Sequence, residues 1–138
     1  MSEPNNWNKT IIDEFRANHG KVGGYFKGMT LLLLHTIGAK SGLPRLNPVV
    51  TLPDGDRYII MASKRGGPTN PDWYYNLVAN PEVNVEIGTE KFKALARVAQ
   101  EPERTELFEK MTSKYPFYAE YQRNTTRLIP VITLSRIS

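Results

Sequence analysis

The chain has 138 residues, 18 of them lysine or arginine and 14 aspartate or glutamate, which gives a formal net charge of +4. This length fits one compact domain, so we expect a single domain over residues 1–138. The modest positive charge favours an acidic partner, and the lack of cysteine excludes disulfides, thiolate catalysis and cysteine-ligated metal centres.

A first helix is predicted near the N-terminus, with Asn6 as its cap and Gly20 as its stop. Its apolar side chains recur at helical spacing on one face: Trp7, Ile11, Ile12 and Phe15. Packing of this face over a sheet is the favoured interpretation. Weak association with a membrane surface is the alternative, because the face begins with a tryptophan.

Three strands are predicted next, at residues 29–37, 46–52 and 57–62. Pro48 cannot donate to a ladder, so the second strand should lie at a sheet edge or carry a bulge. A short helix should follow, from Asn70-Pro71-Asp72 to about Asn80. Asn or Asp caps a helix well, and Pro81 disfavours helical geometry at the residue before it.

The second half of the chain predicts a hairpin, a helix and a last strand. Residues 83–87 and 92–98 alternate with period two around a short turn, and a helix follows from Glu101-Pro102 to about Lys114. The last strand covers residues 129–134. No spacing suits the long crossovers of a parallel sheet, so we predict a mainly β fold, a mostly antiparallel sheet closed into a small barrel with helices outside.

Two turns concentrate positive charge. Lys40 and Arg45 flank a turn of glycine, serine and proline, and Lys64 and Arg65 end the third strand next to Gly66-Gly67. If these strand ends are neighbours, the four cations surround one mouth and can bind a phosphate or carboxylate, with the glycines forming an anion-binding nest. The alternative is that each cation is a solvated loop residue.

Aromatic residues follow the cations in two groups. On the short helix we expect Trp73, Leu77 and Asn76 to face the barrel, where a buried amide needs polar partners. A row of tyrosines follows the long helix and suits a substrate pocket, because a phenol combines an apolar wall with a donor: Tyr115, Tyr118 and Tyr121.

Other chemistries have little support in the sequence. His19 and His35 form no metal motif, and no spacing indicates a Ser-His-Asp constellation, so we expect no metal site and no hydrolase. Neither of the glycine-rich phosphate-binding motifs G-x-x-x-x-G-K-[ST] and G-x-G-x-x-G follows a predicted strand. The apolar run at Leu31–Leu34 is far shorter than the about 20 residues of a membrane span, and we expect a cytoplasmic protein.

Three segments resemble the deazaflavin-dependent nitroreductase family of actinobacteria, whose members use coenzyme F-420 in a split β-barrel: "TIGAKSGLPRLNPV", "YIIMASKRGGPTNPDWYYNLVANPEVNVEIG" and "SKYPFYAEYQ". The similarity runs from the strand at Leu31 to the strand at Ile129. It implies hydride transfer from the reduced deazaflavin to an electron-poor acceptor, such as a quinone, an activated enone or a nitroaromatic.

The resemblance also implies roles for particular residues. The phosphate and oligoglutamate tail of the coenzyme would lie on Lys40, Ser41 and Arg45. The residues bordering the ring or completing the cofactor wall would be Pro48, Ala62, Ser63, Lys64, Gly66, Gly67, Trp73, Asn76 and Leu77. The three tyrosines match positions beside the substrate, where a phenol orients or protonates the acceptor. Arg65 departs from the family pattern and either adds a phosphate contact or points outward.

Alternatives remain open at this point. The same barrel could hold FMN, as in pyridoxamine-phosphate-oxidase-like proteins, or the chain could be a non-catalytic carrier of the coenzyme or of a lipid. A nucleic-acid module ranks last, because no RNA- or DNA-binding motif is recognisable. The expected partner is a small-molecule electron acceptor, and the expected state is a monomer or a homodimer.

Overall fold

The computed structural model describes residues 6–137, apart from the side chains of Asn6, Trp7 and Tyr25. The predicted cap at Asn6 and the apolar contact of Trp7 therefore lie outside the described residues. Over this range the helices are α1 (Asn6–Ala17), α2 (Asp72–Ala79), α3 (Glu103–Lys114) and α4 (Phe117–Arg123), with short 3-10 turns η1 (Gly24–Phe26) and η2 (Lys64–Gly66).

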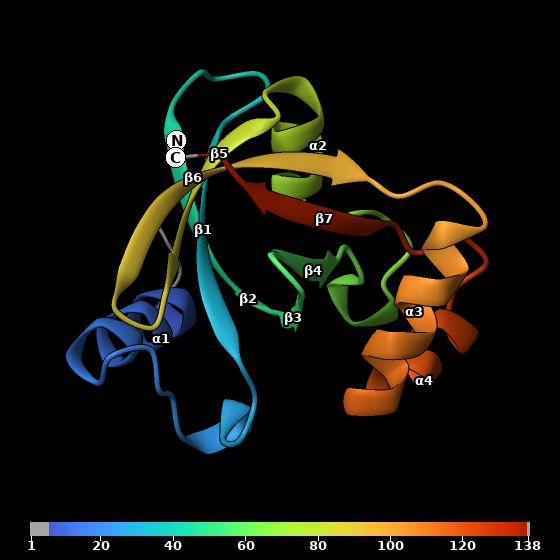
Figure 1. The fold of residues 1–138 in the computed structure, drawn as a ribbon, viewed down its shortest axis with the longest axis horizontal. Helices are drawn as coiled ribbons and strands as arrows, with labels where there is room; N and C mark the ends of the chain where they lie inside the picture. Colours follow the sequence, from blue (N-terminus) through green and yellow to red (C-terminus); the bar gives the residue numbers. More distant parts are fainter. Residues whose placement is uncertain (1–5, 138) are drawn as a thin grey trace.

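Seven strands form one sheet within the described residues, in the order β2-β1-β5-β6-β7-β4-β3. Every pair is antiparallel, as predicted. The strands are β1 (Leu31–Ile37), β2 (Pro44–Val50), β3 (Leu52–Asp54), β4 (Arg57–Met61), β5 (Glu82–Ile87), β6 (Glu90–Val98) and β7 (Val131–Arg136). Figure 1 shows the sheet curling into a half-barrel, with α1 on one side, α3 and α4 on the other, and α2 at its upper end.

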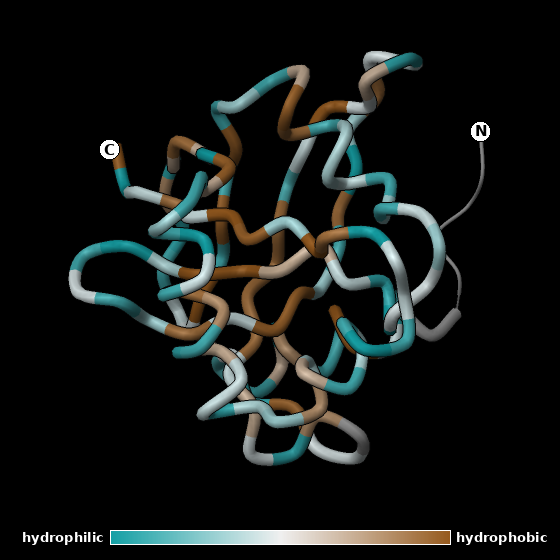
Figure 2. Tube along the Cα trace, turned by 90° about the vertical axis from the view of Figure 1, so that its right-hand side faces the viewer, coloured by the Kyte–Doolittle hydropathy of each residue, from teal (hydrophilic) through white to brown (hydrophobic). Residues whose placement is uncertain are grey.

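Two apolar clusters fill the two faces of the curled sheet. The first joins α1, α3 and α4 to β1 and β4, and the second joins Trp73 and Leu77 of α2 to β5, β6 and β7. In Figure 2 the apolar stretches run through the central strands and the hydrophilic ones occupy the outer turns. The alternation of the strands explains both clusters, because successive side chains point to opposite faces.

Helix α1 packs on the sheet, which confirms the favoured interpretation of its apolar face. Ile11, Ile12 and Phe15 are buried in the first cluster. None of the described helices is long and apolar enough to cross a membrane.

The predicted strand at 46–52 is wrong in its extent, because β2 ends at Val50 and β3 begins at Leu52. Thr51 sits between them, with its hydroxyl donating 2.9 Å to the carbonyl of Ile59 and its amide donating to the carbonyl of Thr30. Pro48 lies on a terminal strand of the sheet, as its missing donor predicts.

Two local details of the helices were also missed. No side-chain cap starts α2: Pro71 occupies the N-cap, and the side chain of Asn70 accepts a hydrogen bond from Arg127 instead. The helix α4 was not predicted: Pro116 occupies its N-cap, and Tyr118 and Tyr121 lie on it. Proline suits the start of a helix, where its missing amide donor has no intrahelical partner to lose.

Candidate functional site

A cavity of about 210 Å³ opens where β2, β4, α2 and α4 meet. Its walls are aliphatic and aromatic, and two cations stand at its rim. The lining residues are Asn8, Phe26, Pro48, Val49, Val50, Met61, Ser63, Lys64, Arg65, Pro71, Trp73, Phe117, Tyr118 and Tyr121. Six residues expected from the sequence are among them: Pro48, Ser63, Lys64, Trp73, Tyr118 and Tyr121.

The loop after β4 carries the cations of this rim in a strained backbone. Lys64, Arg65 and Gly66 all have positive φ, at 47°, 54° and 80°. The left-handed conformation costs about 1–2 kcal/mol for each residue that has a Cβ. Two hydrogen bonds inside the loop maintain the turn, from the amide of Gly66 to the carbonyl of Ser63 and from the amide of Gly67 to the carbonyl of Lys64.

Gly66 seats this loop on α4. A Cβ at this position would lie 2.8 Å from the carbonyl oxygen of Tyr121, too close for any side chain. The same helix presents Tyr118 and Tyr121 to the cavity. The close approach at Gly66 therefore fixes the cation loop directly beside the tyrosine helix.

Arg127, which no sequence pattern indicates, holds the same loop by several hydrogen bonds. Its guanidinium donates to the carbonyls of Ala62, Ser63 and Gly67 at 3.2, 2.7 and 2.9 Å, and to the side-chain oxygen of Asn70 at 2.5 Å. Burial lowers the pKa of this guanidinium from its ordinary value. No local pattern could have revealed these contacts, because they join residues 57 to 65 positions apart.

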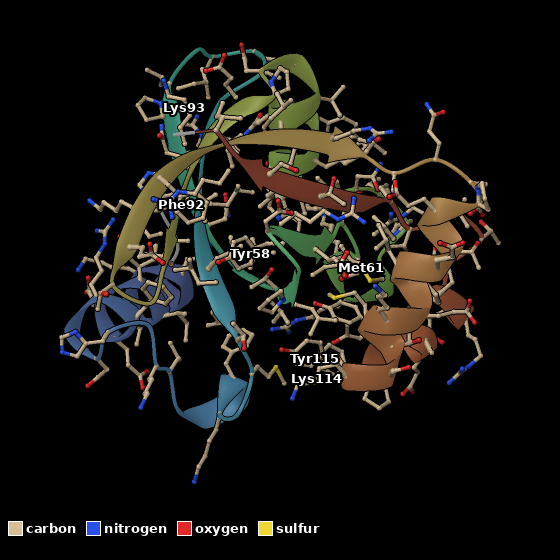
Figure 3. The ribbon with its side chains drawn as sticks, in the orientation of Figure 1. Tyr58, Met61, Phe92, Lys93, Lys114 and Tyr115 are labelled. Atoms are coloured by element: carbon tan, nitrogen blue, oxygen red, sulfur yellow. The ribbon has the colours of Figure 1, made fainter. Side chains whose placement is uncertain are left out.

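The three tyrosines occupy different environments. Tyr118 is buried and Tyr121 half-buried, and both line the cavity, with their rings in edge contact at 5.8 Å. Tyr115 does not line it: its hydroxyl accepts from the amide of Thr30 at 3.1 Å and donates to the carbonyl of Thr51 at 3.2 Å. Figure 3 shows Tyr115 at the end of α3, facing the sheet. Its hydroxyl ties α3 to the strands.

Asn76 joins α2 to the β1–β2 hairpin. Its side-chain oxygen accepts from the amide of Ala39 at 2.9 Å, and its side-chain nitrogen donates to the hydroxyl of Thr36 at 3.1 Å. Both polar atoms of this buried amide are therefore hydrogen-bonded to other groups of the protein. Because Trp73 lies one turn earlier on the same helix face, α2 links the cavity wall to the hairpin.

The hairpin carries the other pair of predicted cations outside the cavity. Lys40 is exposed at its tip, and the Arg45 guanidinium donates to the hydroxyl of Ser41 at 3.4 Å. Arg45 precedes Pro48 on β2, which places it roughly 10 Å along the strand from the cavity. The cations thus form two groups, one at the cavity rim and one farther along β2.

The remaining predicted cofactor residues do not line the cavity. Leu77 is buried in the second apolar cluster, and Ala62 is buried at the end of β4, with its amide donating to the carbonyl of Pro130. Gly67 ends the strained loop and presents its carbonyl to Arg127. These residues support the walls of the cavity rather than lining it.

A buried carboxylate anchors α1, the helix that contributes Asn8 to the cavity. Glu86 of β5 accepts from Arg16 at 3.2 and 2.7 Å and pairs with His35 at 2.5 Å. Burial alone would raise the pKa of Glu86, but the hydrogen bonds from Arg16 and His35 outweigh it and lower this pKa to about 2. Sequence reasoning missed this cluster because its members come from three separate elements.

The geometry suits a planar aromatic ligand that carries an anionic tail. Aliphatic and aromatic walls accept a flat ring, and Lys64 and Arg65 offer charge-assisted hydrogen bonds at the rim. The hairpin cations are close enough for an extended anionic chain to reach them from the cavity. A compact anion alone would leave the apolar walls unused. The donor set therefore fits a deazaflavin nucleotide better than a free phosphate.

Comparison with known proteins gives concordant matches. A family model described as F420H(2)-dependent quinone reductase matches residues 7–136. An F420H(2)-dependent quinone reductase of Mycobacterium tuberculosis is 39% identical over 126 residues, which cover 88% of this chain and 85% of that protein.

Solved structures agree with the sequence matches. The structure of an F420-H2 dependent reductase (FDR-A) has a TM-score of 0.70 and 40% identity, covering 76% of this chain and 93% of that one. A structure described as a domain-swapped dimer has a TM-score of 0.73 and 34% identity, covering 96% of this chain and 100% of that one. The predicted split-barrel fold is confirmed by these neighbours.

Proposed function

Because the chain belongs to the F420H(2)-dependent quinone reductase family, we propose that it reduces a quinone bound beside coenzyme F-420 in the cavity between α2 and α4. The chain is thus an oxidoreductase, and its coenzyme is reduced F-420, as the sequence predicted. The same family match leaves FMN without specific support. Among the acceptors expected from the sequence, only the quinone appears in the family description.

When bound, the coenzyme supplies a hydride, and the protein supplies binding and orientation. Pro48, Ser63 and Trp73 would hold the ring, and Lys64 would bind an anionic group of the coenzyme. Arg45, Ser41 and Lys40 would hold the acidic tail. The separation of the two cation groups supports this assignment, since a charged chain would bridge it.

The tyrosines act on the acceptor. We assign Tyr118 and Tyr121 to orienting the quinone, because both line the cavity and each carries a hydroxyl that can polarise a quinone oxygen. A proton then reaches that oxygen from a tyrosine or from water. Tyr115 receives no such role, because its hydroxyl already serves Thr30 and Thr51.

One observation carries the proposal: Trp73, the strained cation loop, Tyr118 and Tyr121 all line a single cavity. Such a cavity would bring an aromatic coenzyme and an acceptor into contact. Orientation of two reactants in such contact is a large source of rate enhancement.

The decisive experiment is a titration of the purified protein with oxidised F-420, followed by turnover of reduced F-420 with a quinone, an activated enone and a nitroaromatic. We expect saturable quenching of coenzyme fluorescence and the fastest turnover with the quinone. A protein that binds F-420 but reduces none of the acceptors would be a carrier. A yellow protein with tightly bound flavin would instead support FMN.

Assembly and location are further parts of the proposal. We propose a monomer or a homodimer, and the solved relative described as a domain-swapped dimer supports testing the second. Light scattering after gel filtration measures this. Weak membrane association through α1 would have to use residues other than Ile11, Ile12 and Phe15, which are buried. Sedimentation with anionic vesicles tests it.

A further inference from the structure

Arg127 does not line the cavity, but its guanidinium binds the loop that carries Lys64 and Arg65 on both sides of these two residues. Ahead of the strained residues it binds the carbonyls of Ala62 and Ser63, and beyond them it binds the carbonyl of Gly67 and the side chain of Asn70. The left-handed segment is thus bracketed by four hydrogen bonds from one side chain.

The loop has a physical need for such a bracket. Lys64 and Arg65 both adopt φ values that favour glycine, so the local backbone preference opposes the observed shape. A planar guanidinium with five donors can satisfy several carbonyls at fixed angles, which the single ammonium of a lysine cannot do. The identity of the residue at 127 therefore bears on the shape of the loop.

The backbone of Arg127 is also connected to the tyrosine helix. The side-chain nitrogen of Gln122 on α4 donates to the carbonyl of Arg127 at 2.8 Å. The loop rests on the same helix where Gly66 meets the carbonyl of Tyr121. Arg127 therefore lies between the loop that carries Lys64 and the helix that carries Tyr118.

We propose that Arg127 is a positioning residue that fixes Lys64 and Arg65 relative to the tyrosine helix before the coenzyme binds. This proposal rests on the proposed function, because it assigns these cations to the coenzyme. A loop that is already ordered loses little conformational freedom on binding, so its cations bind an anionic group more tightly. Arg127 thus acts on affinity and alignment through the loop, without touching the ligand.

Arg104 offers a matched control. Like Arg127 it binds carbonyl oxygen, donating to that of Ile129 at 3.3 and 2.8 Å, and it donates to the side chain of Gln122 at 3.1 Å. Arg104 is buried, whereas Arg127 is half-buried. None of its hydrogen bonds within the described residues reaches the loop at residues 62–70. Arg104→Lys therefore reports the cost of replacing a carbonyl-binding guanidinium away from the loop, and Arg127→Lys reports such a cost plus the effect on the loop.

The test compares wild type, Arg127→Lys and Arg104→Lys by two measurements. Hydrogen exchange of the Gly66 and Gly67 amides, both hydrogen-bonded inside the loop, is followed by NMR in the coenzyme-free protein. Affinity for oxidised F-420 is then measured by fluorescence. We expect Arg127→Lys to lose protection at both glycines and roughly tenfold of its affinity, a loss of about 1.4 kcal/mol. Arg104→Lys should keep both and lose only resistance to urea.

Two results would overturn the proposal: wild-type protection and affinity in Arg127→Lys, or equal losses in the two variants. If Arg127→Lys does not fold, Asn70→Ala removes one acceptor of the guanidinium, and we expect it to lose part of the protection; full protection would count against the proposal. If the wild-type protein binds no F-420, the proposed function fails, and the exchange measurement still decides whether Arg127 orders the loop.

Discussion

The β1–β2 hairpin carries Lys40 and Arg45 on a turn that is closed by its own backbone hydrogen bonds. The loop with Lys64 and Arg65 is instead held by the side chain of Arg127, 60 residues after Gly67. In the hairpin, the amide of Gly38 donates to the carbonyl of Leu43. The loop instead concentrates its left-handed residues at the cations themselves.

This difference suggests different tasks. The hairpin is encoded locally and tied to the rest of the site through Asn76. The loop is tied to α4, so its position and that of the cavity tyrosines are set together. We therefore expect changes at the hairpin to affect coenzyme binding alone, and changes around the cavity to affect turnover as well.

The sharpest test of this division is Tyr118→Phe. Loss of the hydroxyl should lower kcat with a quinone by roughly 10²-fold, the usual contribution of a positioned proton donor, with little change in coenzyme affinity. Stopped-flow oxidation of reduced F-420 measures it. Arg45→Ala should show the opposite pattern, a weaker affinity with nearly normal kcat at saturation.

Tyr115→Phe is the matched control for the hydroxyl. It removes the bonds to Thr30 and Thr51 and should cost about 1–3 kcal/mol of unfolding free energy, while the folded enzyme turns over normally. Normal turnover of Tyr118→Phe on every acceptor would remove that residue from the mechanism.

A second test compares one cation from each group. Lys64→Ala should weaken affinity for F-420 by roughly 10- to 100-fold, because a charge-assisted hydrogen bond contributes about 1.5–3 kcal/mol. Lys40 is exposed at the hairpin tip and, unlike Lys64, does not line the cavity, so Lys40→Ala should cost less than about 1 kcal/mol and lose its effect at high salt. Fluorescence titrations at two salt concentrations measure both, and equal losses would contradict the division between rim and hairpin.

A third test separates the hairpin from its anchor. Asn76→Ala leaves the amide of Ala39 and the hydroxyl of Thr36 without this partner, and we expect it to lower the unfolding free energy by about 1–3 kcal/mol. Val78→Ala on the same helix is the control, because Val78 is 53% exposed and should change little. Urea unfolding compares them; similar midpoints would show that the Asn76 bonds contribute nothing net.

Much of the fold could be predicted because its signals are local. Alternating strands, the missing donor of Pro48 and the apolar face of α1 each act within a few residues. The residue pattern also pointed to Lys64, Trp73 and Tyr118, which the structure brings to one cavity.

The remaining features depend on contacts that are distant in the sequence. Asn70 looks like a helix cap, and only the fold shows that Arg127 claims its side chain. Tyr115 belongs to the same tyrosine row as Tyr118, and only its contacts across 64 and 85 residues show that its hydroxyl is structural. Composition and periodicity contain no record of such partners.

The smallest expected effect tests the strain of the loop directly. Arg65 has φ 54°, so Arg65→Gly should relieve a backbone cost of about 1–2 kcal/mol, partly offset by the greater freedom of glycine in the unfolded chain. The expected gain is about 0.5–1 kcal/mol of unfolding free energy, measured by urea. Arg97→Gly removes the same side chain from an exposed strand position in β6, where glycine should destabilise. If both variants lose stability alike, the contacts of the Arg65 side chain outweigh the cost of its backbone, and the loop would then be held by its cations as well as by Arg127.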